Sequence, residues 1–157
     1  MALAPETTLK ACPLFKGFTD TGIAIFAAAA VSRAFPKGTA LFSEGKAGDS
    51  LFIVGEGTVR LSARNPGGED VSLGEVTVGE PLGELALVQK GERLCTATAQ
   101  TDVLALEIRS ADFQKLLAQK PQACIKLLMG IVSHFGAKAR DNRDMLRTLV
   151  VRSTSGG

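Results

Sequence analysis

The chain has 157 residues, of which 45% are hydrophobic and 22% are charged, and its 18 basic and 16 acidic side chains give a net charge of +2. This length and composition are typical of one folded domain and exclude a disordered chain. A net charge so close to zero also gives no bulk electrostatic reason to expect binding to nucleic acid or to a membrane surface.

The chain carries no sign of export or of a structural metal. Residues 1–8 lack a basic segment followed by an apolar one, so they do not form a signal peptide. The longest apolar run, 22–31, is much shorter than a membrane span. Cys12, Cys95 and Cys124 are far apart and form no CxxC pair, which argues against a disulfide framework or a metal site. We therefore expect a cytoplasmic protein with free thiols.

The first predicted element is a helix over 23–31, for which Thr19 and Asp20 offer an N-cap. The Pro-Lys-Gly step at 36–38 breaks this pattern, and short apolar runs separated by glycine-bearing turns follow. Such a series predicts a β-sandwich or a barrel-like roll, with its clearest hairpin tip at Asn-Pro-Gly-Gly, 65–68. The expected strands are 39–42, 51–54, 58–63, 71–73, 96–99 and 103–108.

Two helices are expected after the strands. The first covers 110–119, with Ser110 as its cap and Asp112 in its first turn, and the second runs from Pro121 to about Val151. The chain is thus predicted to be one domain over 1–152, with a β-roll at about 36–109, C-terminal helices at about 110–151 and a tail at 153–157.

The stretch from 79 to 87, followed by Arg93, contains the most informative chemistry. Two glycines stand before a short helical turn at 84–87, and free backbone amides at such a turn are suited to a phosphate. The planar guanidinium of Arg93 also suits phosphate oxygens, whereas Glu84 offers an acceptor for a sugar hydroxyl. The alternative is an ordinary Glu84–Arg93 ion pair across a turn, which spacing alone favours.

This stretch resembles the phosphate-binding cassette of the cyclic-nucleotide-binding domain family, which has Gly-Glu-Leu-Ala-Leu, here at 83–87, then five residues and an arginine, here Arg93. The resemblance extends upstream to Gly-Asp-Ser-Leu-Phe-Ile-Val at 48–54 and downstream to 102–117. In all it covers about residues 9–150.

The resemblance implies an α+β, mainly β fold: an eight-stranded jelly-roll-like β-roll with an N-terminal helix, a short cassette helix and a long C-terminal helix. It implies a sensor that is not an enzyme and whose ligand is cAMP or cGMP. Glu84 would accept from the ribose 2′-hydroxyl, Arg93 would pair with the exocyclic phosphate oxygens, and Gly83 would allow close approach. The remaining implied ligand contacts are backbone amides near Leu85, Ala86, Leu94 and Cys95.

Two positions depart from the family pattern. Leu94 stands where a small or hydroxyl-bearing residue is usual, and Leu82, preceded by Pro81, stands where an aromatic residue is common. Because Leu94 lacks the hydroxyl that guanine-selective relatives use, we expect cAMP to be preferred over cGMP. Its bulk also motivates the alternative, a degenerate fold that binds no ligand and acts as a protein-interaction scaffold.

The terminal helix carries a heptad seam that is interrupted by a single polar residue, Asn142. We expect the part from Ile125 to Phe135 to pack on the chain's own roll, and the part beyond Ala139 to pair in a parallel homodimer. Arg140 and Asn142 are the expected contacts to the base. The seam residues are Ile125, Leu128, Val132, Phe135, Ala139, Asn142, Leu146 and Leu149.

Other functions find little support in the sequence. His134, the single histidine, has no partner motif, so a structural role is favoured over a haem or metal ligand. Transcription factors of the resembling family carry a helix-turn-helix after the long helix, and only about six residues follow here, so no direct DNA binding is expected. Because no nucleophile–base pair or carboxylate dyad stands out, we expect a sensor that acts on an unidentified partner protein.

Overall fold

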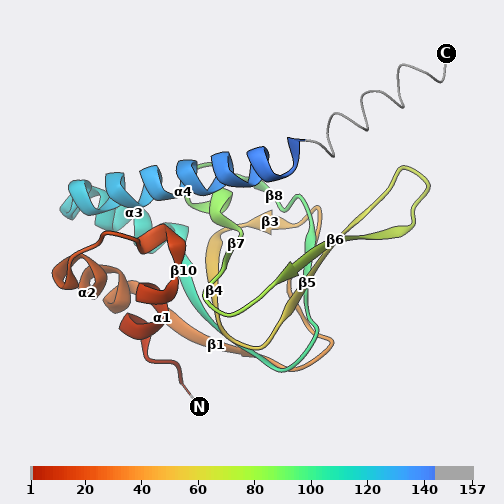
Figure 1. Cartoon of the computed structure of the whole chain (residues 1–157), viewed down its shortest axis with the longest axis horizontal. Coiled ribbons are helices and arrows are strands. Elements are labelled where there is room, and N and C mark those ends of the chain that lie inside the picture. The colour runs from red at the N-terminus through yellow and green to blue at the C-terminus, as the bar shows by residue number, and fades with distance from the viewer. Residues whose placement is uncertain (1, 144–157) are drawn as a thin grey trace.

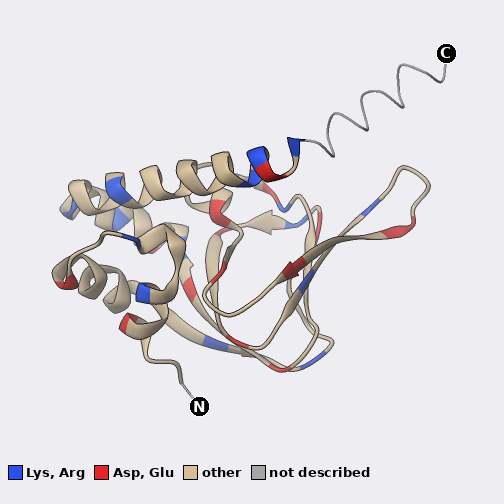
Figure 2. Ribbon diagram, in the orientation of Figure 1, with Lys and Arg blue, Asp and Glu red and all other residues tan. Residues whose placement is uncertain are grey.

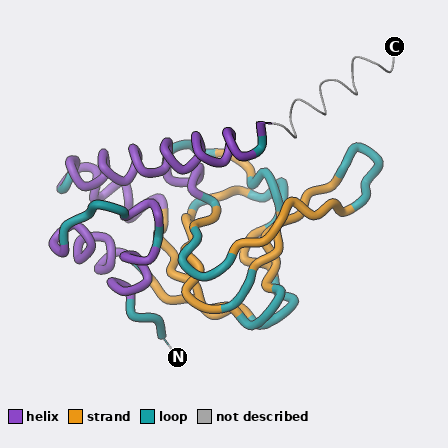
Figure 3. Tube along the Cα trace, viewed as in Figure 1, coloured by secondary structure: helices purple, strands orange, loops and turns teal. Residues whose placement is uncertain are grey.

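A computed structural model describes residues 2–143 of the chain. Figures 1 and 3 show the helices gathered on one side of the strands, so that a helical layer covers one part of a β-roll. The helices are α1 (Pro5–Ala11), the 3-10 turn η1 (Pro13–Phe15), α2 (Asp20–Ala29), the 3-10 turn η2 (Glu84–Leu87), α3 (Ser110–Gln119) and α4 (Pro121–Asp141).

The predicted β-roll is confirmed, although it has ten strands rather than eight. The strands form two four-stranded sheets, ordered β1-β10-β4-β7 and β2-β9-β5-β6, and the small pair β3-β8. They are β1 (Val31–Phe35), β2 (Ala40–Phe42), β3 (Ala47–Gly48), β4 (Ser50–Glu56), β5 (Val59–Arg64), β6 (Asp70–Val76), β7 (Pro81–Leu82), β8 (Gly91–Glu92), β9 (Thr96–Ala99) and β10 (Val103–Arg109).

The N-terminal helices differ in part from the prediction. Thr19 caps α2 as expected, because its side-chain oxygen accepts a hydrogen bond of 3.1 Å from the Gly22 amide. The helix ends at Ala29, however, and Val31 starts β1, which pairs antiparallel with β10. The expected helix end at 31 and roll start near 36 are therefore wrong, because Val31 pairs with Glu107 of β10 and the helix ends at the alanine run before it. Helix α1 was not predicted.

The β5–β6 hairpin turns where the Asn-Pro-Gly-Gly step predicted it. The amide of Asn65 donates to the Glu69 carbonyl at 2.9 Å, and the Gly68 amide donates to the Asn65 carbonyl at 2.9 Å. Figure 1 shows this hairpin projecting away from the roll.

The hydrophobic core consists of two clusters that share strands. Side chains of β4 alternate between them: Leu51 and Ile53 belong to the cluster under the helices, whereas Phe52 and Val54 belong to the cluster inside the roll. Strand β10 alternates in the same way. This period of two follows from strand geometry, because successive side chains point to opposite faces of a sheet.

The two C-terminal helices begin where the sequence predicts them. Asp112 lies in the first turn of α3 and pairs with Arg109 at 3.2 Å, but Ser110 is the first helical residue, and no side chain caps this end. Helix α4 starts at Pro121, which lacks the amide hydrogen that a first helical residue does not need. The predicted stretch from Asp144 to Val151, with Leu146 and Leu149, lies outside the described residues.

The face of α4 that packs on the core differs from the predicted one. Cys124, Leu127 and Ile131 are buried in the cluster under the helices. Ile125 and Val132, which were expected to pack on the roll, are 53% and 71% exposed. The prediction is wrong for these two residues because both faces of the helix are apolar, and periodicity alone does not say which one meets the core.

A close contact with η1 sets the rotation of α4. A Cβ atom added at Gly130 would lie 2.6 Å from the Leu14 carbonyl oxygen, far below a normal contact distance. The backbone of α4 therefore approaches η1 at Gly130 more closely than a residue type with a Cβ atom would allow.

Charges are spread over the whole molecule. Figure 2 shows basic and acidic residues interspersed along the helices and the roll, in keeping with the small net charge. None of the helices within residues 2–143 combines the length and hydropathy that a membrane span requires.

Candidate ligand-binding site

The sequence-predicted ligand residues meet in one cavity of about 220 Å³. Gly83, Glu84, Leu85 and Ala86 line it from the start of the cassette, and Arg93, Leu94 and Cys95 line it from the loop between β8 and β9. The other lining residues are Phe42, Gly48, Leu61, Pro81, Leu82, Gln89, Gly91, Glu92, Phe135 and Lys138.

Arg93 is the central charged group of this cavity and is only 8% exposed. Its Nη2 donates to the Ser50 carbonyl at 2.8 Å and its Nη1 donates to the Gly83 carbonyl at 3.3 Å. The guanidinium carbon lies 4.2 Å from the centre of the Phe42 ring, a cation–π distance. The side chain is thus held by two backbone carbonyls and an aromatic face.

Arg93 has no acidic partner within 4 Å among residues 2–143. Its Nε is buried without a hydrogen-bond partner. Burial lowers the pKa of Arg93 below its usual value, and the charge of Asp49 opposes that change. Arginine keeps its charge in proteins, so the cavity contains a buried cation that can receive an anion. The alternative of a Glu84–Arg93 ion pair is wrong.

Two glycines make room for the guanidinium. A Cβ atom at Gly83 would lie 2.5 Å from Arg93 Nη1, and one at Gly48 would lie 2.7 Å from Arg93 Nε. Gly83 also has φ of +77°, a conformation that side chains other than glycine's disfavour. The expectation that Gly83 allows a close approach therefore describes its contact with the arginine itself.

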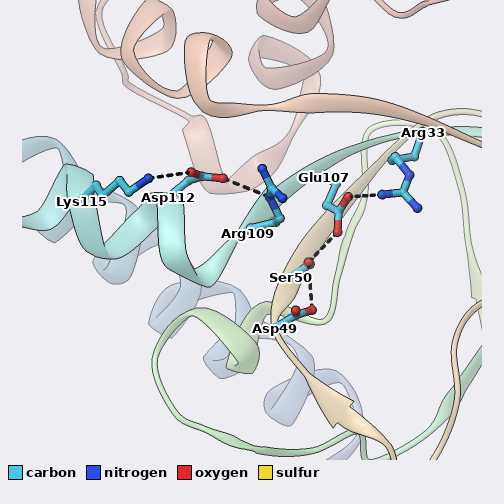
Figure 4. A network of polar contacts seen from close by, with 7 residues as sticks. All are labelled: Arg33, Asp49, Ser50, Glu107, Arg109, Asp112 and Lys115. Carbon is cyan, nitrogen blue, oxygen red and sulfur yellow. Dashed lines mark hydrogen bonds and ion pairs between the residues drawn. The ribbon is translucent and has the colours of Figure 1, made fainter.

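A buried polar network supports the carbonyl that holds Arg93. Ser50 Oγ donates to Glu107 at 2.6 Å, and Arg33 donates to the other oxygen of Glu107 at 2.9 Å (Figure 4). The Asp49 carboxylate lies 3.2 Å from the same hydroxyl. This network fixes the start of β4, from which the carbonyl of Ser50 reaches Arg93.

Glu84 is the first residue of η2 and is 7% exposed. Its Oε1 lies 3.6 Å from Nε2 of His134 on α4. Burial also raises the pKa of the Cys95 thiol, which keeps this cavity residue neutral near neutral pH. No group of three His, Cys, Asp or Glu side chains within the described part of the chain is arranged as a metal site requires.

Leu94 and the predicted base contacts, Arg140 and Asn142, lie outside the interior of the cavity. Leu94 borders the cavity but is 76% exposed, so its side chain lies at the mouth rather than in the interior. Arg140 and Asn142 are exposed and do not line the cavity, and Asn142 instead donates from Nδ2 to the Lys138 carbonyl. On α4 the lining residues are Phe135 and Lys138.

Sequence reasoning missed several residues of the site. Phe42, Phe135 and Lys138 have no signal of their own, because only the folded chain brings them to the cassette. Glu107 did have a signal, since it is a carboxylate inside the otherwise apolar strand 103–108. A charge in such a strand needs a buried partner.

A short helix and an arginine at opposite ends of one loop close a cavity against the β-roll, so the fold and the site together define a roll domain with a candidate ligand cavity. The chain belongs to the cyclic nucleotide-binding domain family, whose sequence profile matches residues 32–120. The family that the sequence resembles is thereby confirmed.

Comparison with known proteins agrees with this family. The chain is 31% identical to the Cyclic AMP receptor protein of Thermus thermophilus over 113 residues, which are 72% of this chain and 52% of that protein. It is 35% identical to a cyclic nucleotide-gated potassium channel of Mesorhizobium japonicum over 114 residues, 73% of this chain and 30% of the channel. The chain thus spans about half the length of the receptor and less of the channel.

A solved structure is also similar. The N-terminal domain of a transcriptional regulator from Streptomyces coelicolor A3(2) superposes with a TM-score of 0.74 at 32% identity, covering 88% of this chain and 94% of that one. The roll with its helical layer is therefore a fold that the N-terminal domain of a transcriptional regulator also has.

Proposed function

We propose that this chain is a non-enzymatic sensor that binds a 3′,5′-cyclic nucleotide, prefers cAMP to cGMP, and signals to a partner protein through α4. One observation carries the proposal: Arg93 is a buried cation that borders a cavity and has no carboxylate within 4 Å in the described chain. A buried charge without a partner is costly, and a bound phosphate supplies that partner.

The roles of the lining residues follow from their chemistry. Arg93 pairs with the exocyclic phosphate oxygens, and Glu84 accepts a hydrogen bond from the ribose 2′-hydroxyl. Apolar side chains of Leu61 and Leu85 line the cavity around the ribose and base. The name of the Thermus thermophilus relative, a cyclic AMP receptor, supports the same ligand class for this chain.

The preference for cAMP rests on Leu94, which offers no hydroxyl to guanine. We assign the base contacts on α4 to Phe135 and Lys138, because these two residues line the cavity and Arg140 and Asn142 do not. A nucleotide that contacts Phe135 and Lys138 interacts directly with α4. Its affinity then depends on the position of this helix, so binding shifts the population toward the position that passes the signal.

The test is isothermal titration of nucleotide-stripped protein with cAMP and, separately, with cGMP. We expect saturable binding that Arg93→Ala weakens by about 2–5 kcal/mol, or roughly 30-fold to several thousand-fold, because the phosphate loses its buried partner. Arg64→Ala is the matched control, since Arg64 is exposed and does not line the cavity. Unchanged affinity in Arg93→Ala would refute the assignment of the site.

The competing function is a ligand-free scaffold that uses α4 for protein contacts. The exposed Leu94 at the cavity mouth and the exposed apolar residues of α4 are the observations that favour it. Folded, stripped protein that gives no heat with either nucleotide would establish this alternative and exclude the sensor.

We further propose that α4 pairs with a second copy of the chain in a parallel homodimer. Ile125, Met129, Val132 and Phe135 form an exposed apolar stripe at helical spacing. Light scattering after size exclusion should give a dimer that Val132→Glu converts to a monomer. Ser133→Glu, which changes an exposed neighbour on the same helix, should remain dimeric. A monomeric wild type, or a Val132→Glu dimer, would contradict the pairing.

A further inference from the structure

The contact between α4 and η2 brings together two largely buried polar side chains whose facing atoms have no hydrogen-bond partner within residues 2–143. Nε2 of His134 and Oε1 of Glu84 lie 3.6 Å apart, and the two side chains are 15% and 10% exposed. Both atoms are buried, and neither makes a hydrogen bond. Buried polar atoms normally have partners, so two unsatisfied atoms facing each other across this gap require an explanation.

Charged and neutral groups surround this pair, in which His134 faces Glu84 at 3.6 Å. The thiol of Cys12 has its pKa raised by burial to about 12, and burial also raises that of Cys95, so both are neutral below pH 8. The charges of Asp49 and Glu107 act on Arg93 at longer range. The charged or titratable groups of the surrounding elements include Cys12 after α1, Asp49 before β4, Arg93 and Cys95 after the cassette, Glu107 on β10 and Lys138 on α4. Helix α3, which packs against both α4 and η2, adds the ion pair of Asp112 and Lys115.

The chemistry of imidazole determines when the gap closes. A carboxylate accepts a hydrogen bond from Nε2 only when that nitrogen carries a proton, and the neutral ring has a proton on just one of its two nitrogens. The protonated ring donates from both and adds a positive charge opposite Glu84. Histidine is the side chain that ordinarily changes charge between about pH 5 and 8.

We propose that His134 is a positioning residue: its protonated ring draws in Oε1 of Glu84, fixes this carboxylate for the ribose hydroxyl, and so makes nucleotide affinity depend on pH through the α4–η2 contact. Glu84 lines the cavity, so the residue that meets His134 is also the one that, under the proposed function, accepts from the ribose hydroxyl. Affinity is higher on the acid side, where His134 carries its charge, and falls as the pH rises and the ring loses its proton. This inference rests on the proposed function for its ligand.

The first experiment measures the dissociation constant of cAMP at pH 5.5, 6.5 and 7.5. Wild-type protein should bind about fivefold more tightly at pH 5.5 than at pH 7.5, the size of a modest coupling between two sites. His134→Gln keeps a donor but does not titrate, so its affinity should be the same at the three pH values. The chain has no other histidine, and a slope that persists in His134→Gln, or a flat wild-type profile, would overturn the proposal.

The second experiment needs no nucleotide. Thermal unfolding of wild type, Glu84→Gln, His134→Gln and the double variant forms a mutant cycle at pH 5.5 and at pH 7.5. We expect a coupling of about 3 °C at pH 5.5 that disappears at pH 7.5. A cycle without coupling at both pH values would overturn the pairing. If no nucleotide binds but the coupling is present, the proposed function fails and the contact between His134 and Glu84 stands.

Discussion

The substitution Gly48→Ala tests the arrangement of Arg93 with a single methyl group. A Cβ atom at Gly48 would lie 2.7 Å from Arg93 Nε, 2.9 Å from its Cδ and 3.0 Å from its Cζ. Ordinary contacts of this kind begin near 3.4 Å, so the guanidinium must move by several tenths of an ångström. The backbone of Gly48 does not have positive φ, so the methyl group acts on its neighbour and not through backbone strain.

Such a shift displaces the guanidinium from the Ser50 and Gly83 carbonyls and from the Phe42 ring. Loss of that alignment should weaken nucleotide binding by about 1–3 kcal/mol, or roughly 5- to 150-fold, the usual effect of overpacking a well-packed site. The assay is isothermal titration with cAMP, and urea unfolding reports whether the fold persists.

The control lies on the opposite strand. Gly91 pairs with Gly48 in the β3–β8 ladder and also lines the cavity, yet a Cβ atom there would meet nothing within 4 Å. Gly91→Ala should therefore bind like wild type. If Gly48→Ala also binds like wild type, the reasoning that Arg93 must hold this position is refuted.

Three further predictions concern Glu107, two glycines of α4 and the cysteine thiols. Glu107→Ala should lower the free energy of unfolding in urea by about 1–3 kcal/mol, because it removes the buried acceptor that Ser50 Oγ and Arg33 share. An unchanged midpoint would contradict the network. Gly130→Ala should lower the free energy of unfolding by about 1–3 kcal/mol, because its Cβ clashes with a backbone carbonyl. Gly136→Ala, whose added Cβ meets nothing closer than 3.8 Å, should instead raise the free energy of unfolding by up to about 1 kcal/mol. Equal effects of the two substitutions would contradict the close approach of α4 to η1. Because a pKa raised to about 12 leaves little thiolate at pH 8, Cys12 should resist alkylation in the folded protein and react on unfolding. Half-buried Cys95 should react before Cys12 and should be protected by bound nucleotide, and mass spectrometry can follow the labelling of each thiol. Equal labelling of Cys12 and Cys95 in the folded protein would contradict this prediction.

The cassette could be predicted because its chemistry is local in sequence. Glu84 and Arg93 belong to one loop; their spacing alone favoured an ion pair between them, and the resemblance to the family's cassette is what indicated a phosphate site. The groups that hold Arg93 could not be predicted, because the Ser50 carbonyl and the Phe42 ring come from other strands. Every residue type has a backbone carbonyl, so no sequence pattern shows which carbonyls will accept a hydrogen bond from Arg93.

The long helix shows a second limit. Both Leu127 and Val132 belong to apolar stripes with helical spacing, and only one stripe reaches the core. The choice depends on the approach of α4 to η1 at Gly130, a contact between segments more than a hundred residues apart. Periodicity therefore predicted the helix and its amphipathic character but not its rotation.

The alternation along β4 has a consequence for how such a protein changes over evolutionary time. Leu51 and Ile53 belong to the helical cluster and Phe52 and Val54 to the cluster inside the roll, so β4, like β10, presents a different face to each core. Mutations confined to the helical cluster can therefore accumulate without repacking the cluster inside the roll. The same roll is then free to be joined to different outputs, as its similarity to a receptor and to a channel illustrates.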